Sequence, residues 1–171
     1  MTTLLFDDCT RNASETEELG YRLSEVILPE LCKTGFVFIA LNGELGAGKT
    51  AFIRGLMRRF NEDIYVHSPS YTILNEYRGC CPDGAEVTVA HFDVWRIHDE
   101  DDLFSVGFFD WFPSEIPDNP NAYAGGNSRI VMAVEWGENI EYALPDSLYT
   151  VDIEGSGNEP RHIRVFYKDK I

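Results

Sequence analysis

The fold of this chain is decided by one stretch, Gly43-Glu44-Leu45-Gly46-Ala47-Gly48-Lys49-Thr50, which has the Walker A spacing of a phosphate-binding loop. Glycines let the backbone turn tightly and bring its N–H groups close to phosphate oxygens. A helix starting near Lys49 adds the positive end of its dipole. Lys49 can then place a positive charge on the terminal phosphates, and the Thr50 hydroxyl can bind Mg²⁺. The stretch therefore predicts a site for a nucleotide phosphate chain.

The segments on either side of the loop agree with this prediction. Phe36–Leu41 is apolar throughout, which is typical of a central parallel strand covered on both faces. After the loop, apolar residues recur on one face of an expected helix. They are Phe52, Ile53, Leu56, Met57 and Phe60. A strand, a phosphate loop and a helix in this order form the core unit of a P-loop NTPase.

Two later strands are each expected to end in a carboxylate, at Asp93 and at Glu135. In open α/β sheets the ligand crevice lies at the carboxyl ends of the strands, so both acids should come close to the phosphate loop. One acid would hold Mg²⁺ and the other would orient or activate water, and the residues alone do not decide between them. A lone histidine on a strand is typical of a core or rim position, so His91 is assigned no role.

The remaining segments predict an α/β fold whose mostly parallel central sheet is flanked by helices and extended by antiparallel hairpins. A helix is expected to begin at a capping box formed by Ser14 and Glu17. The expected additions to the sheet are a short strand at 3–6, a hairpin of 71–77 with 86–92, and a closing hairpin of 148–153 with 162–167. Residues 113–128 have many turn formers and no periodicity, which predicts a flexible surface loop.

Charge and cysteine content limit the possible partners and the setting. The 171 residues include 14 Lys and Arg and 29 Asp and Glu, which give a formal net charge of −15. Such acidity argues against a broad contact with nucleic acid and against binding to anionic membranes. The four cysteines lack metal-site spacing, and two of them are adjacent, which disfavours a disulfide framework. With no signal-peptide pattern and no run of about 20 apolar residues, we expect a cytoplasmic location.

Taken together, the motifs resemble one family closely, the TsaE (YjeE) family of small P-loop ATPases in bacterial tRNA threonylcarbamoyladenosine biosynthesis. Besides the phosphate loop, the matching segments are Ser68-Pro69-Ser70-Tyr71-Thr72, Asn75-Glu76-Tyr77, His91-Phe92-Asp93-Val94-Trp95-Arg96-Ile97 and Glu135-Trp136. Their order and spacing cover residues 14–166. The chain departs from the family at Gly137, where proline is common.

The resemblance implies a single P-loop ATPase domain spanning 1–171. It implies Mg²⁺-dependent hydrolysis of ATP to ADP and phosphate, weak in the isolated chain and expected to work with partner proteins. In this family the ATPase supports transfer of a threonylcarbamoyl group to the adenosine next to the anticodon of tRNA. The implied partners are a transferase subunit and its inactive homologue, so tRNA would be reached only indirectly.

The resemblance also implies roles for individual residues. The implied phosphate-binding residues are Leu45, Gly46, Ala47, Gly48, Lys49 and Thr50. The implied Mg²⁺ ligands are Thr50 and Glu135. The implied catalytic residues are Lys49, Asp93 and Glu135. Further nucleotide contacts are implied for Ser14, Trp136 and Arg161, and residues 68–72 match a switch-like loop.

Two other functions stay open at this point. One is a small-molecule P-loop kinase, and the other is a nonhydrolysing interaction module that uses ATP as a structural ligand. The sequence has no evident second pocket for a phosphate acceptor and no arginine-rich lid, which weakens the kinase hypothesis. Measuring phosphate release, alone and with partners, separates the ATPase from the module.

Overall fold

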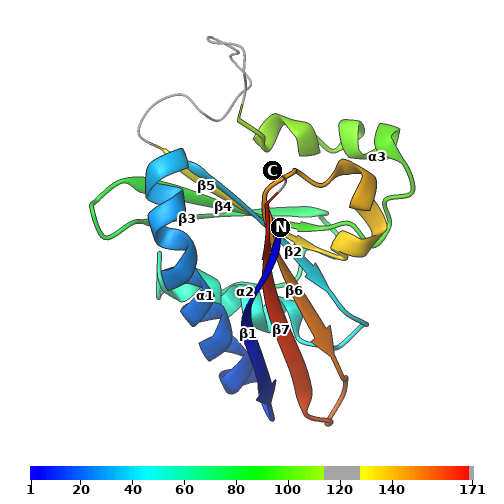
Figure 1. The fold of residues 1–171 in the computed structure, drawn as a ribbon. Helices are drawn as coiled ribbons and strands as arrows, with labels where there is room; N and C mark the ends of the chain where they lie inside the picture. The colour runs from blue at the N-terminus through cyan, green and yellow to red at the C-terminus, as the bar shows by residue number, and fades with distance from the viewer. Residues whose placement is uncertain (114–127, 170–171) are drawn as a thin grey trace.

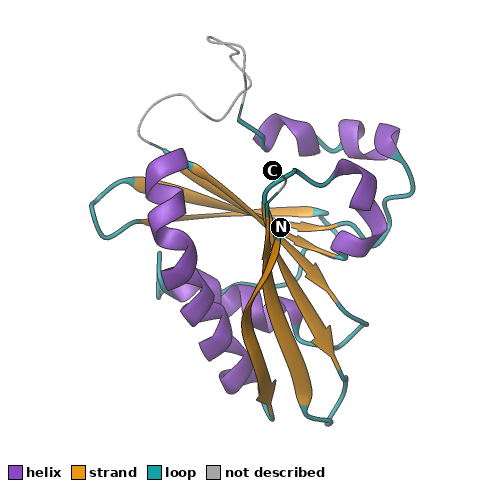
Figure 2. Cartoon of the chain, in the orientation of Figure 1, coloured by secondary structure: helices purple, strands orange, loops and turns teal. Residues whose placement is uncertain are grey.

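The structure is a computed structural model in which residues 1–113 and 128–169 are described. The predicted flexible loop at 113–128 therefore lies, except for its two end residues, outside the described part of the chain. The described residues form a seven-stranded sheet with helices packed on both faces (Figure 1, Figure 2). The order of the strands across the sheet is β1-β7-β6-β2-β5-β4-β3.

The chain contains seven strands, three α-helices and two 3₁₀ segments within the described residues. The strands are β1 (Thr2–Thr10), β2 (Phe36–Asn42), β3 (Leu74–Cys80), β4 (Glu86–Asp93), β5 (Arg129–Glu135), β6 (Leu148–Glu154) and β7 (Arg161–Lys168). The α-helices are α1 (Ala13–Thr34), α2 (Lys49–Arg58) and α3 (Glu100–Ser105). Two 3₁₀ segments complete the set, η1 (Phe108–Trp111) and η2 (Gly137–Ala143).

The centre of the sheet is parallel and its two sides are antiparallel. Strand β2 pairs in parallel with both β5 and β6, and β5 pairs in parallel with β4. On one side β3 forms an antiparallel hairpin with β4, and on the other β7 pairs antiparallel with β6 and β1. The predicted fold class, a mostly parallel P-loop type sheet with antiparallel additions, is therefore confirmed.

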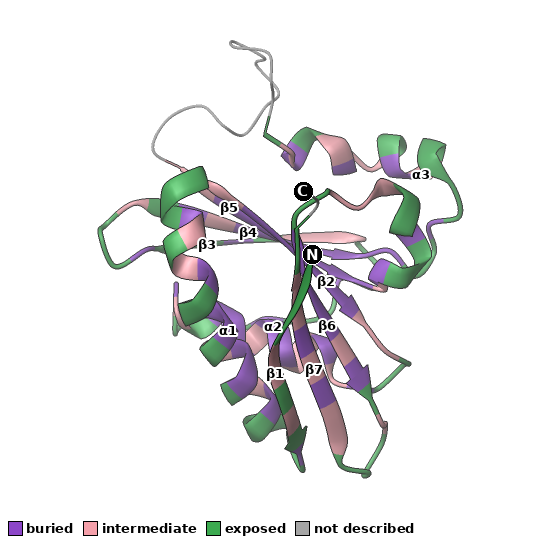
Figure 3. Cartoon of the chain, in the orientation of Figure 1, coloured by how far each residue is buried: buried purple, intermediate pink, exposed green. Residues whose placement is uncertain are grey.

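Both faces of the central strands are buried, as the unbroken apolar run of β2 predicts. Val37, Ile39 and Leu41 pack in one cluster with the apolar faces of α1 and α2. Phe38 and Ala40, which alternate with them, pack in a second cluster beneath α3, η1 and η2. Figure 3 shows this burial along the middle of the sheet. Packing on both faces thus holds the residues at the ends of the central strands in place.

Helices α1 and α2 cross closely because glycine occupies both sides of the contact. A Cβ placed on Gly20 would lie 2.0 Å from the carbonyl oxygen of Phe52, and one on Gly55 would lie 1.7 Å from that of Glu17. No side chain fits at these distances, so the contact depends on both glycines. Within the described ranges, none of the helices combines the length and the apolar character needed to span a membrane.

The start of α1 differs from the predicted capping box. The helix is capped two residues earlier by Asn12, whose side chain accepts a hydrogen bond from the N–H of Glu15 at 2.9 Å. Glu15 in turn accepts from the N–H of Arg11, the residue before the cap, at 2.7 Å. Glu17 instead forms an ion pair with Arg54 of α2 at 2.9 Å. The capping box predicted at Ser14 and Glu17 was therefore wrong, because the helix cap lies two residues earlier.

Strand β3 also begins later than predicted, at Leu74 in place of residue 71. The N–H of Ile73 donates to the carbonyl of Pro69 at 2.7 Å, and Ile73 has a φ of 68°. These features make 69–73 a turn. The turn leaves residues 68–72 as a loop beside the end of β4, since the N–H of Asp93 donates to the carbonyl of Ile73 at 2.9 Å.

Candidate functional site

The phosphate loop lies between the end of β2 and the start of α2. All three of its glycines have backbone conformations that other residues rarely adopt, with φ of 141° at Gly43, 77° at Gly46 and 108° at Gly48. A Cβ at Gly43 would also lie 2.5 Å from the carbonyl oxygen of Ile153. Gly48 is the N-cap of α2, so the free N–H groups of the first helical turn are directed into the loop. The predicted strand, loop and helix are all present.

A cavity of about 480 Å³ lies over this loop. Its size is within the range of about 300–1,000 Å³ that is typical of small-molecule sites. Its lining residues are Leu45, Gly46, Ala47, Gly48, Lys49, Thr50, Ser68, Ser70, Asp93, Trp95, Glu135 and Trp136. The structure thus brings together all but two of the residues that the sequence predicts for the site, the exceptions being Ser14 and Arg161.

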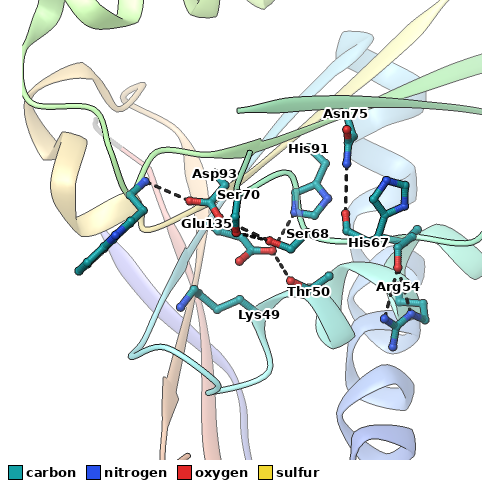
Figure 4. A network of polar contacts seen from close by, with 12 residues as sticks. Lys49, Thr50, Arg54, His67, Ser68, Ser70, Asn75, His91, Asp93 and Glu135 are labelled. Atoms are coloured by element: carbon teal, nitrogen blue, oxygen red, sulfur yellow. Dashed lines mark hydrogen bonds and ion pairs between the residues drawn. The ribbon is translucent and has the colours of Figure 1, made fainter. Parts of the chain in front are cut away.

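The two predicted acids reach the cavity from neighbouring strands. Asp93 and Glu135 are paired in the register of β4 and β5, and both residues are buried. The hydroxyl of Thr50, in the first turn of α2, donates a hydrogen bond to Oε1 of Glu135 at 2.7 Å (Figure 4). This bond joins the phosphate loop to the end of β5 and sets two side-chain oxygens side by side.

Lys49 lies against the backbone of its own loop. Its ammonium group donates to the carbonyl oxygens of Gly43 at 2.5 Å and Glu44 at 3.0 Å. Burial lowers the pKa of this ammonium group, while the negative charges of Glu135, Glu138 and Asp93 act in the opposite direction. The result is a desolvated positive charge at the edge of the cavity, where an anionic ligand would be favoured.

Asp93 is held by the loop at 68–72. The Ser70 hydroxyl donates to Oδ2 of Asp93 at 2.7 Å, and the Ser68 hydroxyl lies 3.5 Å from the same oxygen. The backbone N–H of Trp95 donates to Oδ1 at 3.1 Å. Asp93 therefore joins the loop at 68–72 to the end of β4. A switch-like role of this loop stays a prediction.

Two tryptophans line one wall of the cavity. The rings of Trp95 and Trp136 have centroids 4.3 Å apart, and the ammonium group of Lys49 lies 3.7 Å from the centroid of the Trp136 ring. Trp136 has a φ of 66°, so the chain turns sharply after Glu135. A cation at this distance from an indole face is stabilised by the ring electrons.

The residues present fit a nucleotide with Mg²⁺. The hydroxyl of Thr50 and the carboxylates of Glu135 and Asp93 are oxygen donors of the kind that Mg²⁺ prefers, and Mg²⁺ needs only one or two carboxylates when phosphate oxygens complete its shell. The loop supplies backbone N–H groups and one lysine for those phosphates. Every component lies on the lining of one cavity.

Comparison with known proteins gives the same picture. The family model described as the threonylcarbamoyl adenosine biosynthesis protein TsaE matches residues 10–163. The chain belongs to the TsaE family. A protein of this name from Haemophilus influenzae is 30% identical over 135 residues, which are 79% of this chain and 73% of the relative. Another from Treponema pallidum is 28% identical over 156 residues, which are 91% of this chain and 96% of the relative.

A solved structure supports the fold of this TsaE-family chain. The crystal structure of YdiB from Bacillus subtilis superimposes with a TM-score of 0.61 at 23% sequence identity. The alignment covers 98% of this chain and 88% of YdiB. The resemblance predicted from sequence is thus confirmed at the level of family and fold, and TsaE proteins are P-loop nucleotide-binding proteins of tRNA threonylcarbamoyladenosine biosynthesis.

Two residues predicted to contact the nucleotide lie outside the cavity lining. Ser14 is exposed in the first turn of α1. Arg161, at the start of β7, donates to the carbonyl oxygens of Ala47 at 2.9 Å and Gly46 at 3.2 Å in the phosphate loop. Arg161 thus touches the loop that would hold the nucleotide, and its direct contact with nucleotide, like that of Ser14, stays a prediction.

Sequence reasoning assigned no role to two residues here, Trp95, which lines the cavity, and His91, which contacts Glu135 from outside the lining. His91 is fully buried, and its Nε2 lies 2.8 Å from Oε1 of Glu135, the oxygen that also accepts from Thr50. The available signal was the spacing of His91 and Asp93, because residues two apart on a strand point to the same face. That signal did not reveal Glu135 as the partner, since this depends on the pairing of β4 with β5.

Proposed function

We propose that this chain binds ATP with Mg²⁺ in the cavity over the phosphate loop and hydrolyses it to ADP and phosphate. The observation that carries the proposal is the hydrogen bond from Thr50 to Glu135 at 2.7 Å, because it joins the loop to a strand-end acid. The contact supports a metal site, because in P-loop enzymes a loop hydroxyl and a strand-end acid serve the same ion.

Each lining residue has a distinct part in this proposal. Backbone N–H groups from Leu45 to Thr50 would bind the phosphates, and Lys49 would add its charge to the terminal ones. Thr50 and Glu135 would hold Mg²⁺, which would neutralise phosphate charge. Asp93 would orient or activate the attacking water, because it faces the same cavity from the next strand.

The proposed ATPase is an accessory subunit and not the transferase. Membership of the TsaE family supports a role in threonylcarbamoyl transfer to the adenosine next to the anticodon of tRNA. The partners would be the transferase subunit and its inactive homologue, in the cytoplasm. The net charge of −15 supports contact with tRNA through these partners only, because phosphate backbones attract clustered positive charge.

Reconstitution with the two partner subunits tests this function. Multi-turnover modification of tRNA and phosphate release are measured with wild type, Lys49→Ala and, as a matched control, Lys33→Ala in the last turn of α1. Wild type and Lys33→Ala should support both reactions, and Lys49→Ala should support neither. Normal modification with Lys49→Ala would contradict the proposal.

The same assay distinguishes the other two functions. A nonhydrolysing module would support modification without releasing phosphate from ATP. A small-molecule kinase would transfer phosphate to an added metabolite and would leave tRNA modification unchanged. Either result would replace the ATPase assignment.

A further inference from the structure

We infer that His91 is a positioning residue for the metal site, which it serves by fixing the carboxylate of Glu135. This inference rests on the proposed function, because it assumes that Glu135 holds Mg²⁺. His91 itself lines no part of the cavity. It lies behind Glu135 on the same face of the sheet, so it would act only through that acid.

The register of the strands places the two side chains together. In the parallel pairing of β4 and β5, His91 stands opposite Ala133 and Asp93 stands opposite Glu135. His91 and Glu135 are therefore diagonal neighbours on one face of the sheet, within reach of long side chains. The small side chain of Ala133 leaves room for the imidazole to reach along the strand to Glu135, and Nε2 lies 2.8 Å from Oε1.

The surroundings of His91 define which nitrogen carries the proton. An ionised carboxylate only accepts hydrogen bonds, so Nε2 must be the donor to Glu135. Nδ1 is buried and has no hydrogen-bond partner among the described residues. A hydrogen on Nδ1 would leave a buried donor unsatisfied, which is costly, whereas an unused lone pair costs less. The tautomer with hydrogen on Nε2 is therefore the one that fits these contacts.

His91 differs from Thr50 as a partner of Glu135. The Thr50 hydroxyl can rotate and is itself a proposed ligand of the metal. The imidazole is fully buried and packs near the ring of Tyr77, with centroids 6.2 Å apart, so its N–H has a fixed direction. Both of these hydrogen bonds end on Oε1. His91 thus restrains the rotation of the carboxylate and keeps its other oxygen available.

The binding experiment compares ATP affinity with and without Mg²⁺ in several variants. His91→Leu removes the donor and keeps apolar bulk, and His91→Gln places an amide N–H near the position of Nε2. Residues of this kind that orient metal ligands change metal affinity by about 10- to 100-fold. We expect His91→Leu to raise the Mg²⁺ concentration for half-saturation by that factor, with Mg²⁺-free ATP binding unchanged, and His91→Gln to restore most of the loss.

A matched control separates this effect from a general loss of a buried polar group. Thr150→Val, on β6, removes a buried hydroxyl that has no partner among the described residues and that lies outside the cavity lining. It should leave the Mg²⁺ dependence unchanged. Wild-type Mg²⁺ dependence in folded His91→Leu, or equal losses in His91→Leu and His91→Gln, would overturn the inference. Should His91→Leu not fold, His91→Asn replaces it, because its shorter amide cannot reach Glu135.

A second readout needs no nucleotide and distinguishes the failure of this inference from that of the proposed function. Nitrogen-15 NMR of the imidazole should show hydrogen on Nε2 and a slowly exchanging N–H, and Glu135→Gln should shift that signal. An Nδ1–H ring in wild type would overturn the inference even if Mg-ATP binds. The expected NMR signals in a protein that binds no Mg-ATP would support the His91 contact and refute the proposed function.

Discussion

Asp93 and Glu135 stand directly opposite each other in the parallel pairing of β4 and β5, yet their carboxylates receive different donors. Glu135 accepts from the hydroxyl of Thr50 in the phosphate loop. Asp93 accepts from the hydroxyl of Ser70 in the loop at 68–72. Two acids at one sheet edge are therefore joined to two different elements. This difference predicts that substitution of Glu135 mainly affects metal binding and that substitution of Asp93 mainly affects hydrolysis.

Replacing Asp93 with asparagine should impair hydrolysis more than binding. The amide keeps the shape of the side chain but does not accept a proton from water, and loss of a general base typically lowers a rate by about 10²–10⁴-fold. We expect phosphate release to fall by that factor and ATP affinity to change less than tenfold. Asp101→Asn, on the exposed part of α3, is the control and should match wild type in both measurements. Equal hydrolysis by Asp93→Asn and wild type would remove Asp93 from the reaction.

Removing the guanidinium of Arg161 should weaken ATP binding by disturbing the phosphate loop. Arg161 donates to the carbonyls of Gly46 and Ala47, and these bonds hold the backbone of the loop at two consecutive residues. Hydrogen bonds from a charged group contribute about 1.5–3 kcal/mol, so we expect Arg161→Ala to lose roughly tenfold or more in affinity. Hydrogen exchange of the loop amides should also become faster.

Arg164 supplies a matched control on the same strand. It pairs with Glu154 at the surface, away from the loop, and surface pairs of this kind contribute little. Arg164→Ala should therefore keep wild-type ATP affinity and loop exchange. Equal effects of the two substitutions would show that charge in the closing hairpin matters, and not the contact of Arg161 with the loop.

The crossing of α1 and α2 should not tolerate a methyl group at Gly55. A Cβ there would lie 1.7 Å from the carbonyl oxygen of Glu17, so the helices must separate. Forcing extra atoms into a packed contact typically costs about 1–3 kcal/mol, which corresponds to a fall of roughly 2–12 °C in melting temperature for a domain of this size. Arg58→Ala, at the exposed end of α2, should change stability by less than about 0.5 kcal/mol. Calorimetric melting of both variants measures the difference.

The ion pair of Asp83 with Arg129 should make stability depend on acid pH. Hydrogen bonds from Arg129 and from the N–H of Ala85 lower the pKa of the Asp83 carboxyl to about 2. A carboxyl whose folded pKa is depressed stabilises the protein above its unfolded pKa of about 3.9, and this contribution is lost as the pH falls towards 2. Asp83→Asn should therefore weaken the loss of stability between about pH 4 and 2. NMR titration of Asp83 in wild type with a pKa near 4 would contradict this account.

Sequence alone predicted those parts of the site that depend on local spacing. The glycines, Lys49 and Thr50 follow one another in the chain, and Asp93 and Glu135 each end a recognisable apolar strand. Their meeting in one cavity follows from the rule that parallel strands present ligands at their carboxyl ends. The fold class followed in the same way from runs of apolar residues and turn formers.

The contacts that were missed depend on which distant segments become neighbours. His91 reaches Glu135 only because β4 and β5 pair with a particular register, although 44 residues separate them in sequence. Arg161 reaches the phosphate loop because β7 folds back beside β6, and its contacts with the carbonyls of Gly46 and Ala47 have no sequence signature. The helix cap was predicted at Ser14 and lies at Asn12. Both residues are polar and are followed by Glu three residues later, so this pattern alone does not choose between them.

Equilibrium binding of ATP to the isolated chain, with Mg²⁺ and with a chelator, tests the central claim most directly when wild type is compared with Glu135→Ala. The account predicts that Mg²⁺ strengthens ATP binding to wild type, and that Glu135→Ala keeps Mg²⁺-free binding but loses this gain. Failure of wild type to bind ATP, or a gain from Mg²⁺ that is undiminished in Glu135→Ala, would contradict it.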